Sequence, residues 1–358
     1  METLTSRQPW ALGPSPVGAK ENRLCSFLMG FSEYDHAKYD ILFRRNRFMT
    51  VPIRPRGLGF QAHSSLWWLF VLLGLGMLSL GWAESDPTHR AKDLERPVAW
   101  PDGLIPYDVS KLSEAQRVTV LQAMQRWMDT GARIAFVPRT SQTEYVNFTG
   151  STNAGNNTSQ TGFKPGVRTD INITPFWWRQ GDWMPAHELG HVLGFHHEHA
   201  RWDRDEYVTI HYEHLKPERK DDYDWIPRTH WLASSPSYDY HSIMHYRVCW
   251  SSACESQCKD GDGTSPCAVI DPVGTKYDGV IGQWGDNGIS AMDAERTRQA
   301  YGSGRTIYVN PASAGDGSGT LLNPYHDFVQ ACKAAGADSR FIVFSSDGSF
   351  STRASSQR

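Results

Sequence analysis

Apolar residues recur at helical spacing in one stretch in the first half of the chain. From Val118 to Trp127 they stand three or four positions apart, which places them on one face of an α-helix. Ser113 and Gln116, just before this run, occupy the positions of a capping box, in which each side chain bonds the backbone N–H of the other residue. The pattern predicts an amphipathic helix over residues 113–129, with its apolar face in the core.

Short runs of β-branched and aromatic residues predict strands on both sides of a long polar loop. The loop covers residues 149–168, which are rich in Gly, Asn and Ser. Asp182 is expected to cap the helix that follows the last strand. A further helix is predicted within residues 285–301, with Ser290 as its cap and Asp293 as the capping-box partner. The predicted strands cover residues 104–109, 134–137, 145–148 and 170–174.

The longest apolar run lies near the N-terminus and predicts export of the chain. Residues 66–80 carry no charge, but they are fewer than the roughly 20 residues that a membrane-spanning helix needs. Their length suits the core of a signal peptide with cleavage behind Ala83. We interpret residues 1–83 as a leader and signal peptide, and we expect Met49 to be the true start because it gives a leader of ordinary length. The alternative is an uncleaved membrane anchor over residues 66–83.

Two segments flank the central part of the chain. Residues 84–97 are polar and charged, and we interpret them as a linker or a short pro-segment. Gly302-Ser303-Gly304 is predicted to be a linker, and residues 303–358 a linker and an incomplete C-terminal module. This tail loosely resembles the start of a parallel β-helix domain, although it is too short for three coils. Its predicted strands cover residues 306–310 and 341–344.

Composition and cysteine placement narrow the class of protein. The chain has 358 residues and a formal net charge of -3, which suit one or two soluble domains and offer no case for nucleic-acid binding. Four of the six cysteines lie close together. In an exported chain two disulfides among them are favoured over a structural zinc site, with three ways of pairing. The four are Cys249, Cys254, Cys258 and Cys267.

A dense group of histidines offers metal ligands and a base. His187 and His191 are four residues apart, so both imidazoles can reach one metal ion from one face of a helix. Glu188, beside the first histidine, can take a proton from water at that metal. Gly194 permits the left-handed turn that ends a helix, so the chain can bend back and present His197 as a third ligand. Three nitrogens and one open position indicate a catalytic zinc, whereas the competing interpretation is a histidine-rich surface helix.

These motifs resemble the astacin family of metzincin zinc endopeptidases, in a bacterial type that lacks the usual cysteines. The histidine motif over residues 187–197 is followed by a run over 198–208 that is similar to the astacin signature almost throughout. A second matching motif covers residues 242–246. The resemblance extends over roughly residues 98–302, which we take as the zinc protease domain. Residues 84–97 hold no phenylalanine-glycine-aspartate element like the inhibitory one of the family.

The resemblance implies a role for each matching residue. His187, His191 and His197 would be the ligands of one Zn²⁺ per chain, and Glu188 would be the general base. Tyr246 would be an additional zinc ligand that swings out to stabilise the transition state. A tyrosine O–H near the metal could donate a hydrogen bond to the developing oxyanion.

Other residues are expected to support this site. By the same resemblance, Met244 would form the turn beneath the metal, and Glu198 would hold the mature N-terminus. Gly194 would end the helix that carries the first two ligands. His196 and His199 are interpreted as surface or supporting histidines rather than ligands.

The resemblance also implies the fold. We expect an α+β metzincin catalytic domain of two subdomains. A twisted, mostly parallel sheet and two helices would lie above the cleft. Below it we expect an irregular half after Gly194, with one C-terminal helix.

The resulting functional hypothesis is a secreted zinc-dependent endopeptidase. Glu188 would activate a zinc-bound water, and Tyr246 would stabilise the transition state. We expect protein or peptide substrates, a monomer, no nucleic acid, and contact with a membrane only through an uncleaved N-terminal segment. The alternative is a non-catalytic surface-binding protein on a protease scaffold, against which the intact Glu188 and the three histidines argue.

Overall fold

The computed structural model describes residues 94–151, 155–248, 268–277, 279–281, 288–345 and 349–354. The predicted signal peptide, the four clustered cysteines and most of the predicted pro-segment lie outside the described residues. Within these ranges no helix has both the length and the apolar character that crossing a membrane requires.

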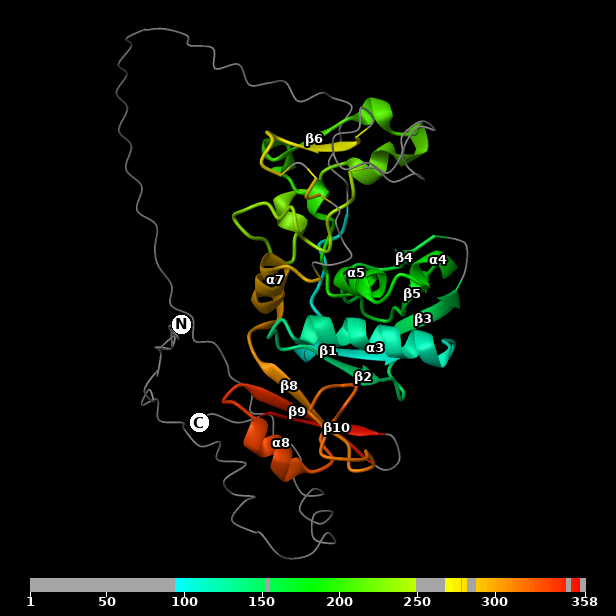
Figure 1. The fold of residues 1–358 in the computed structure, drawn as a ribbon, viewed down its shortest axis with the longest axis vertical. Coiled ribbons are helices and arrows are strands. Elements are labelled where there is room, and N and C mark those ends of the chain that lie inside the picture. The colour runs from blue at the N-terminus through cyan, green and yellow to red at the C-terminus, as the bar shows by residue number, and fades with distance from the viewer. Residues whose placement is uncertain are drawn as a thin grey trace, which may run out of the picture. The chain divides into compact units, whose positions relative to one another are not determined.

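One mixed sheet of five strands organises the first half of the described chain. Its order is β2-β1-β3-β5-β4, and only the edge strand β4 runs antiparallel to its neighbour. The four predicted strands are confirmed, with ends shifted by up to three residues, whereas β4 lies inside the predicted loop. The strands are β1 (Leu104–Asp108), β2 (Ala135–Pro138), β3 (Val146–Ser151), β4 (Asn157–Thr158) and β5 (Thr169–Ile173) (Figure 1).

Two helices pack on each other next to this sheet (Figure 1). The first, α3 (Glu114–Met128), begins with the predicted capping box between Ser113 and Gln116. The second, α5 (Trp183–Val192), carries the first two histidines of the motif. The fully buried Trp127 of α3 joins them, because its indole N–H donates to the backbone carbonyl of Ala186, 2.8 Å away.

The prediction that Asp182 caps the start of α5 was wrong. Asp182 occupies the cap position, but its side chain accepts no hydrogen bond from the backbone of this helix. Its carboxylate instead receives two hydrogen bonds from Arg126 of α3, at 2.5 and 3.0 Å. A charged, two-point partner outcompetes a backbone N–H for the same oxygens, so Asp182 ties α3 to α5 rather than capping.

The part of the chain after Gly194 is irregular, as predicted. Between Gly194 and α7 (Ala291–Tyr301), its described residues form short 3-10 turns and one two-stranded antiparallel sheet, β6 (Val208–Ile210) with β7 (Ile270–Pro272). The predicted last helix is confirmed as α7, with a complete capping box between Ser290 and Asp293. The 3-10 turns are Glu198–Ala200, Arg204–Glu206, Tyr212–His214, Pro217–Tyr223 and Arg228–His230. The α+β arrangement expected from the sequence is therefore confirmed.

The end of the chain adds a three-stranded sheet of order β10-β9-β8. Strands β8 (Arg305–Val309) and β9 (Ser339–Phe344) are parallel and joined through α8 (Phe328–Ala334), while β10 (Phe350–Ala354) is antiparallel to β9. Among the described residues the tail is a β–α–β unit with one additional antiparallel strand. The predicted linker, which leads into β8, is held to the rest of the chain by backbone contacts. Ser303 forms an isolated β-bridge with Ala132, and the N–H of Gly304 donates to the Gly131 carbonyl.

Tyr308 of β8 anchors this tail in the main hydrophobic core. Its side chain is 1% exposed, and its hydroxyl donates to the Phe136 carbonyl at 2.8 Å. Tyr308→Phe should lower the free energy of unfolding by about 1–2 kcal/mol, because a buried acceptor loses its donor. Denaturant unfolding measures this. The control is Tyr325→Phe, because the Tyr325 hydroxyl makes no hydrogen bond among the described residues. Equal midpoints for wild type and Tyr308→Phe would contradict the prediction.

Candidate metal centre and active site

The end of helix α5 brings three histidines together. His187 and His191 are one turn apart on α5, so their rings leave the helix on the same face. Gly194 then has a φ of 95°, in the left-handed region, and the helix ends. A β-carbon at this position would also collide with the side chain of Leu232. The chain therefore turns back at Gly194 and brings His197 to the first two histidines.

The three imidazoles have the spacing of ligands around one small cation. The Nε2 atom of His197 lies 3.2 Å from that of His187 and 3.1 Å from that of His191. Tetrahedral zinc with Zn–N bonds of about 2.0–2.1 Å would hold its nitrogens roughly 3.3 Å apart. The three residues form the one group of potential metal ligands found within the described residues.

Backbone carbonyls set which nitrogen is free to bind a metal in two of the three rings. The Nδ1 atom of His187 lies 2.7 Å from the Ile243 carbonyl, and that of His191 lies 2.8 Å from the Phe195 carbonyl. A carbonyl only accepts, so each Nδ1 carries the proton and each Nε2 presents a lone pair. Burial lowers the pKa of His187 to about 4 and that of His191 to about 3, so both rings are neutral near pH 7. The Nε2 lone pairs of these neutral rings are therefore available to bind a cation.

Glu188 lies beside this centre as a buried carboxyl group. It is 4% exposed, and burial raises its pKa to about 7. The Thr158 hydroxyl of edge strand β4 lies 2.7 Å from its Oε2 and 3.1 Å from its backbone carbonyl. A carboxyl group with a pKa near neutrality suits a general base, and Thr158 holds it in one orientation.

Tyr246 packs against the third histidine. Its ring centroid lies 4.1 Å from that of His197 and 4.2 Å from that of His199. Burial raises the pKa of its phenol well above the ordinary value, so the hydroxyl stays protonated and can donate a hydrogen bond. His199 is 0% exposed and His196 is 7% exposed, so the interpretation of these two histidines as surface residues was wrong. The alternative, that they support the metal ligands, stays a prediction.

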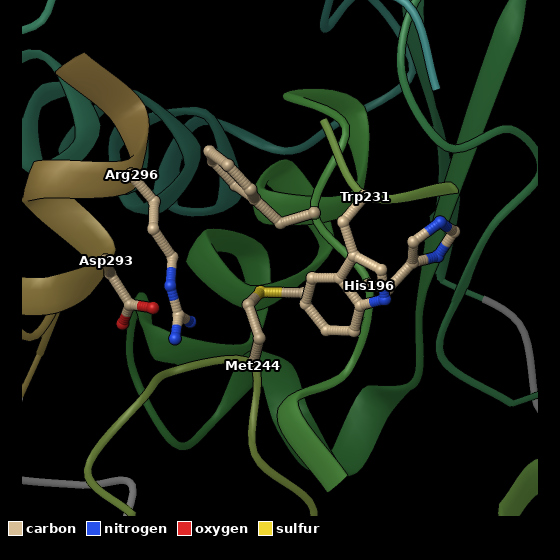
Figure 2. Close-up of a pocket in the computed structure, with 6 residues that line it drawn as sticks. His196, Trp231, Met244, Asp293 and Arg296 are labelled. Atoms are coloured by element: carbon tan, nitrogen blue, oxygen red, sulfur yellow. The ribbon is translucent and has the colours of Figure 1, made fainter. Parts of the chain in front are cut away.

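Met244 packs against helix α5, which carries the first two histidines. Its side chain packs on Gly190, where an added β-carbon would collide with the methionine sulfur. Glu198, next in the chain after the third histidine, is 0% exposed and accepts two hydrogen bonds from Arg296 of α7. Figure 2 shows Arg296 and Asp293 of α7 on one side of Met244, with His196 and Trp231 on the other.

Sequence reasoning missed two residues that contact this site. Thr158 lies in the edge strand β4, which has two residues and no apolar pattern. Arg296 has the sequence context of an ordinary polar residue of the last helix. In α7 it stands three residues after Asp293, so the two side chains share one face of the helix. This spacing was the only feature of the sequence that could have indicated a shared role.

The chain has relatives among proteins of known family. The model of the family Astacin, a peptidase family, matches residues 93–302, which is more than half of the chain. Bone morphogenetic protein 1 of Xenopus laevis is 31% identical over 232 residues, covering 63% of this chain and 29% of that protein. Zinc metalloproteinase nas-8 of Steinernema carpocapsae is 36% identical over 151 residues, covering 41% of this chain and 34% of that protein.

The chain is also similar to solved structures. High choriolytic enzyme 1, a hatching enzyme zinc-protease from the medaka fish Oryzias latipes, has 28% sequence identity and a TM-score of 0.48. The match covers 58% of this chain and 94% of that one. The chain spans about a third or less of the curated relatives named above. On the family match over residues 93–302, the chain belongs to the astacin family of peptidases.

Proposed function

We propose that this chain is a zinc-dependent endopeptidase that cleaves proteins or peptides. The observation that carries the proposal is the convergence of three histidine side chains next to the buried Glu188, with the Nε2 atom of His197 3.1–3.2 Å from those of the other two. Membership of a peptidase family supports it. A surface-binding protein would have no use for a buried carboxyl group beside a metal site.

His187, His191 and His197 would hold one zinc ion per chain. The carbonyls of Ile243 and Phe195 support this assignment, since they keep two of the rings in the tautomer that leaves Nε2 free. When bound, zinc would lower the pKa of a coordinated water to about 7 and polarise the carbonyl of the scissile peptide bond.

Glu188 would act as the general base and acid. Its carboxylate accepts a proton from the attacking water and passes it to the nitrogen of the leaving amine. Tyr246 would donate its hydroxyl proton in a hydrogen bond to the oxyanion that develops on the attacked carbonyl. Met244 and Gly194 would serve as supports, the first through packing and the second through the turn that returns His197.

Export and the state of the mature protein are part of the same proposal. The uncharged run of residues 66–80 and the cleavage position behind Ala83 support secretion, and an uncleaved anchor over residues 66–83 is the alternative. We further propose disulfides among Cys249, Cys254, Cys258 and Cys267 and a monomeric protein. N-terminal sequencing of the exported protein distinguishes a cleaved signal peptide from an anchor.

The test of the function uses the purified full chain. Its zinc content is measured by atomic absorption, and its cleavage of casein is followed by gel electrophoresis. We expect one zinc per chain and progressive cleavage. Protein that holds one zinc and leaves casein, gelatin and a peptide library intact would favour the surface-binding alternative.

The hydroxyl of Thr158 should contribute to turnover through Glu188. Thr158→Val keeps the shape of the side chain and removes the donor 2.7 Å from the carboxylate. We expect kcat on a peptide substrate to fall about tenfold, within the range of one hydrogen bond to a charged group. Thr158→Ser, which retains the hydroxyl, is the matched control and should keep most of the activity. Equal kcat values for the valine variant and wild type would rule the contribution out.

A further inference from the structure

Glu198 connects the third histidine to two other parts of the molecule. It follows His197 directly, and its backbone N–H donates to the Met244 carbonyl at 3.0 Å. Its carboxylate is fully buried and accepts from the Asp239 backbone N–H at 2.8 Å. A buried carboxylate requires a counter-charge and full hydrogen bonding, so its cation matters for the position of this segment.

Arg296 supplies that cation from α7. Its Nη1 lies 2.6 Å from Glu198 Oε2, and its Nη2 lies 2.9 Å from Oε1, which is a two-point ion pair. Arg296 is 4% exposed, and its Nη2 also donates to Ser235 Oγ at 2.8 Å. Arg201 is the second cation nearby, but it lies 3.6 Å from Glu198 and makes a two-point pair with Asp203.

The same helix also contacts the segment that supports His187. Asp293 of α7 accepts from the Ser242 hydroxyl at 2.7 Å and from the Ile243 N–H at 2.9 Å. The carbonyl of Ile243 in turn receives the Nδ1 proton of His187. One turn of α7 therefore contacts the supports of both His187 and His197.

We propose that Arg296 is a positioning residue of the metal centre, which holds His197 in place by clamping the neighbouring Glu198. The inference rests on the proposed function, because it gives the three histidines a metal to bind. The side chain of Arg296 acts on the histidine only through Glu198 and the backbone between them. Supporting residues of this kind typically change metal affinity or activity about 10- to 100-fold when they are replaced.

The experiment compares Arg296→Gln with wild type, using the full chain. Zinc affinity is measured by competition with a chelating dye, and the geometry of the site by the visible absorption of the cobalt-substituted protein. We expect the zinc dissociation constant to rise about 10- to 100-fold and the cobalt bands to shift. For peptide cleavage we expect kcat to fall and KM to change little, because no substrate contact is removed.

Arg298→Gln is the matched control. Arg298 lies on the same helix, and its guanidinium pairs with Glu295 and the Thr130 carbonyl, so it leaves the metal-site segments alone. We expect wild-type zinc affinity and cobalt bands for this variant. Near-UV circular dichroism of the metal-free proteins separates a general loss of folding from a local effect.

Arg296→Lys keeps the test decisive if the glutamine variant does not fold. Lysine retains the buried charge but replaces the two-point pair by a single contact, so it should fold and bind zinc several-fold more weakly. Wild-type zinc affinity and cobalt bands in any folded Arg296 variant would overturn the proposal. Tight metal binding by wild type without cleavage would overturn the proposed function and leave the inference about Arg296 standing.

Discussion

Glu188→Ala should lower kcat/KM for a peptide substrate by about 10⁴-fold, the upper end of what general acid–base catalysis contributes. The expected loss is large because this buried carboxyl group, which directly follows His187 in α5, would be the base of the proposed mechanism. Burial raises the pKa of this carboxyl group above its usual range. The variant should still bind one zinc, since none of the three Nε2 atoms belongs to it.

The control for this prediction is another glutamate in the same protein. Glu295 is exposed on α7 and pairs with Arg298, so Glu295→Ala should keep wild-type turnover. Initial rates on a fluorogenic peptide and zinc content are measured for all three proteins. Equal turnover of wild type and Glu188→Ala, both with zinc bound, would refute the assignment of Glu188 as the base.

Tyr246→Phe should lower kcat by about 10²–10³-fold, the range observed when one donor to a developing oxyanion is removed. The ring would remain, so its packing at 4.1 Å on His197 and 4.2 Å on His199 should persist. We therefore expect zinc content and thermal stability to stay close to those of wild type. KM should change little, because the hydroxyl would act on the transition state more than on the bound substrate.

Tyr223 offers a control of matched chemistry. Its ring lies 5.6 Å from that of Tyr246, and its buried hydroxyl has no hydrogen-bond partner among the described residues. Tyr223→Phe should leave kcat near the wild-type value. If Tyr246→Phe lost activity only in proportion to a loss of zinc, Tyr246 would be a support of the metal centre rather than a donor in the transition state.

Predictions from sequence succeeded where the physics is local. The capping boxes at Ser113 and Ser290 each depend on a residue three positions away, and both are present in the structure. The strands were found because β-branched and aromatic residues gather in short runs. The cap at Asp182 failed because its oxygens bond Arg126, 56 residues earlier in the chain.

Contacts between residues far apart in the sequence could not be predicted from local sequence patterns. Strand β4 has two residues, and backbone bonds to β5 rather than a side-chain pattern define it. The tail was predicted to be a linker and an incomplete module, and its sequence did not indicate that Tyr308 bonds the Phe136 carbonyl and shares the main core. No spacing in the sequence signals a partner that far away.

The sequence by itself determined the histidines that converge and the residue that would act as base. His187, Glu188, His191, Gly194 and His197 lie within eleven positions, and helix geometry with one left-handed turn at Gly194 is enough to bring the three imidazoles together. Only the tertiary structure decided how that group is held. Arg296 reaches Glu198 across 98 residues, and Thr158 reaches Glu188 across 30. Such contacts exist only after the chain has packed, because burial makes an ion pair or a single hydrogen bond strong enough to position a side chain.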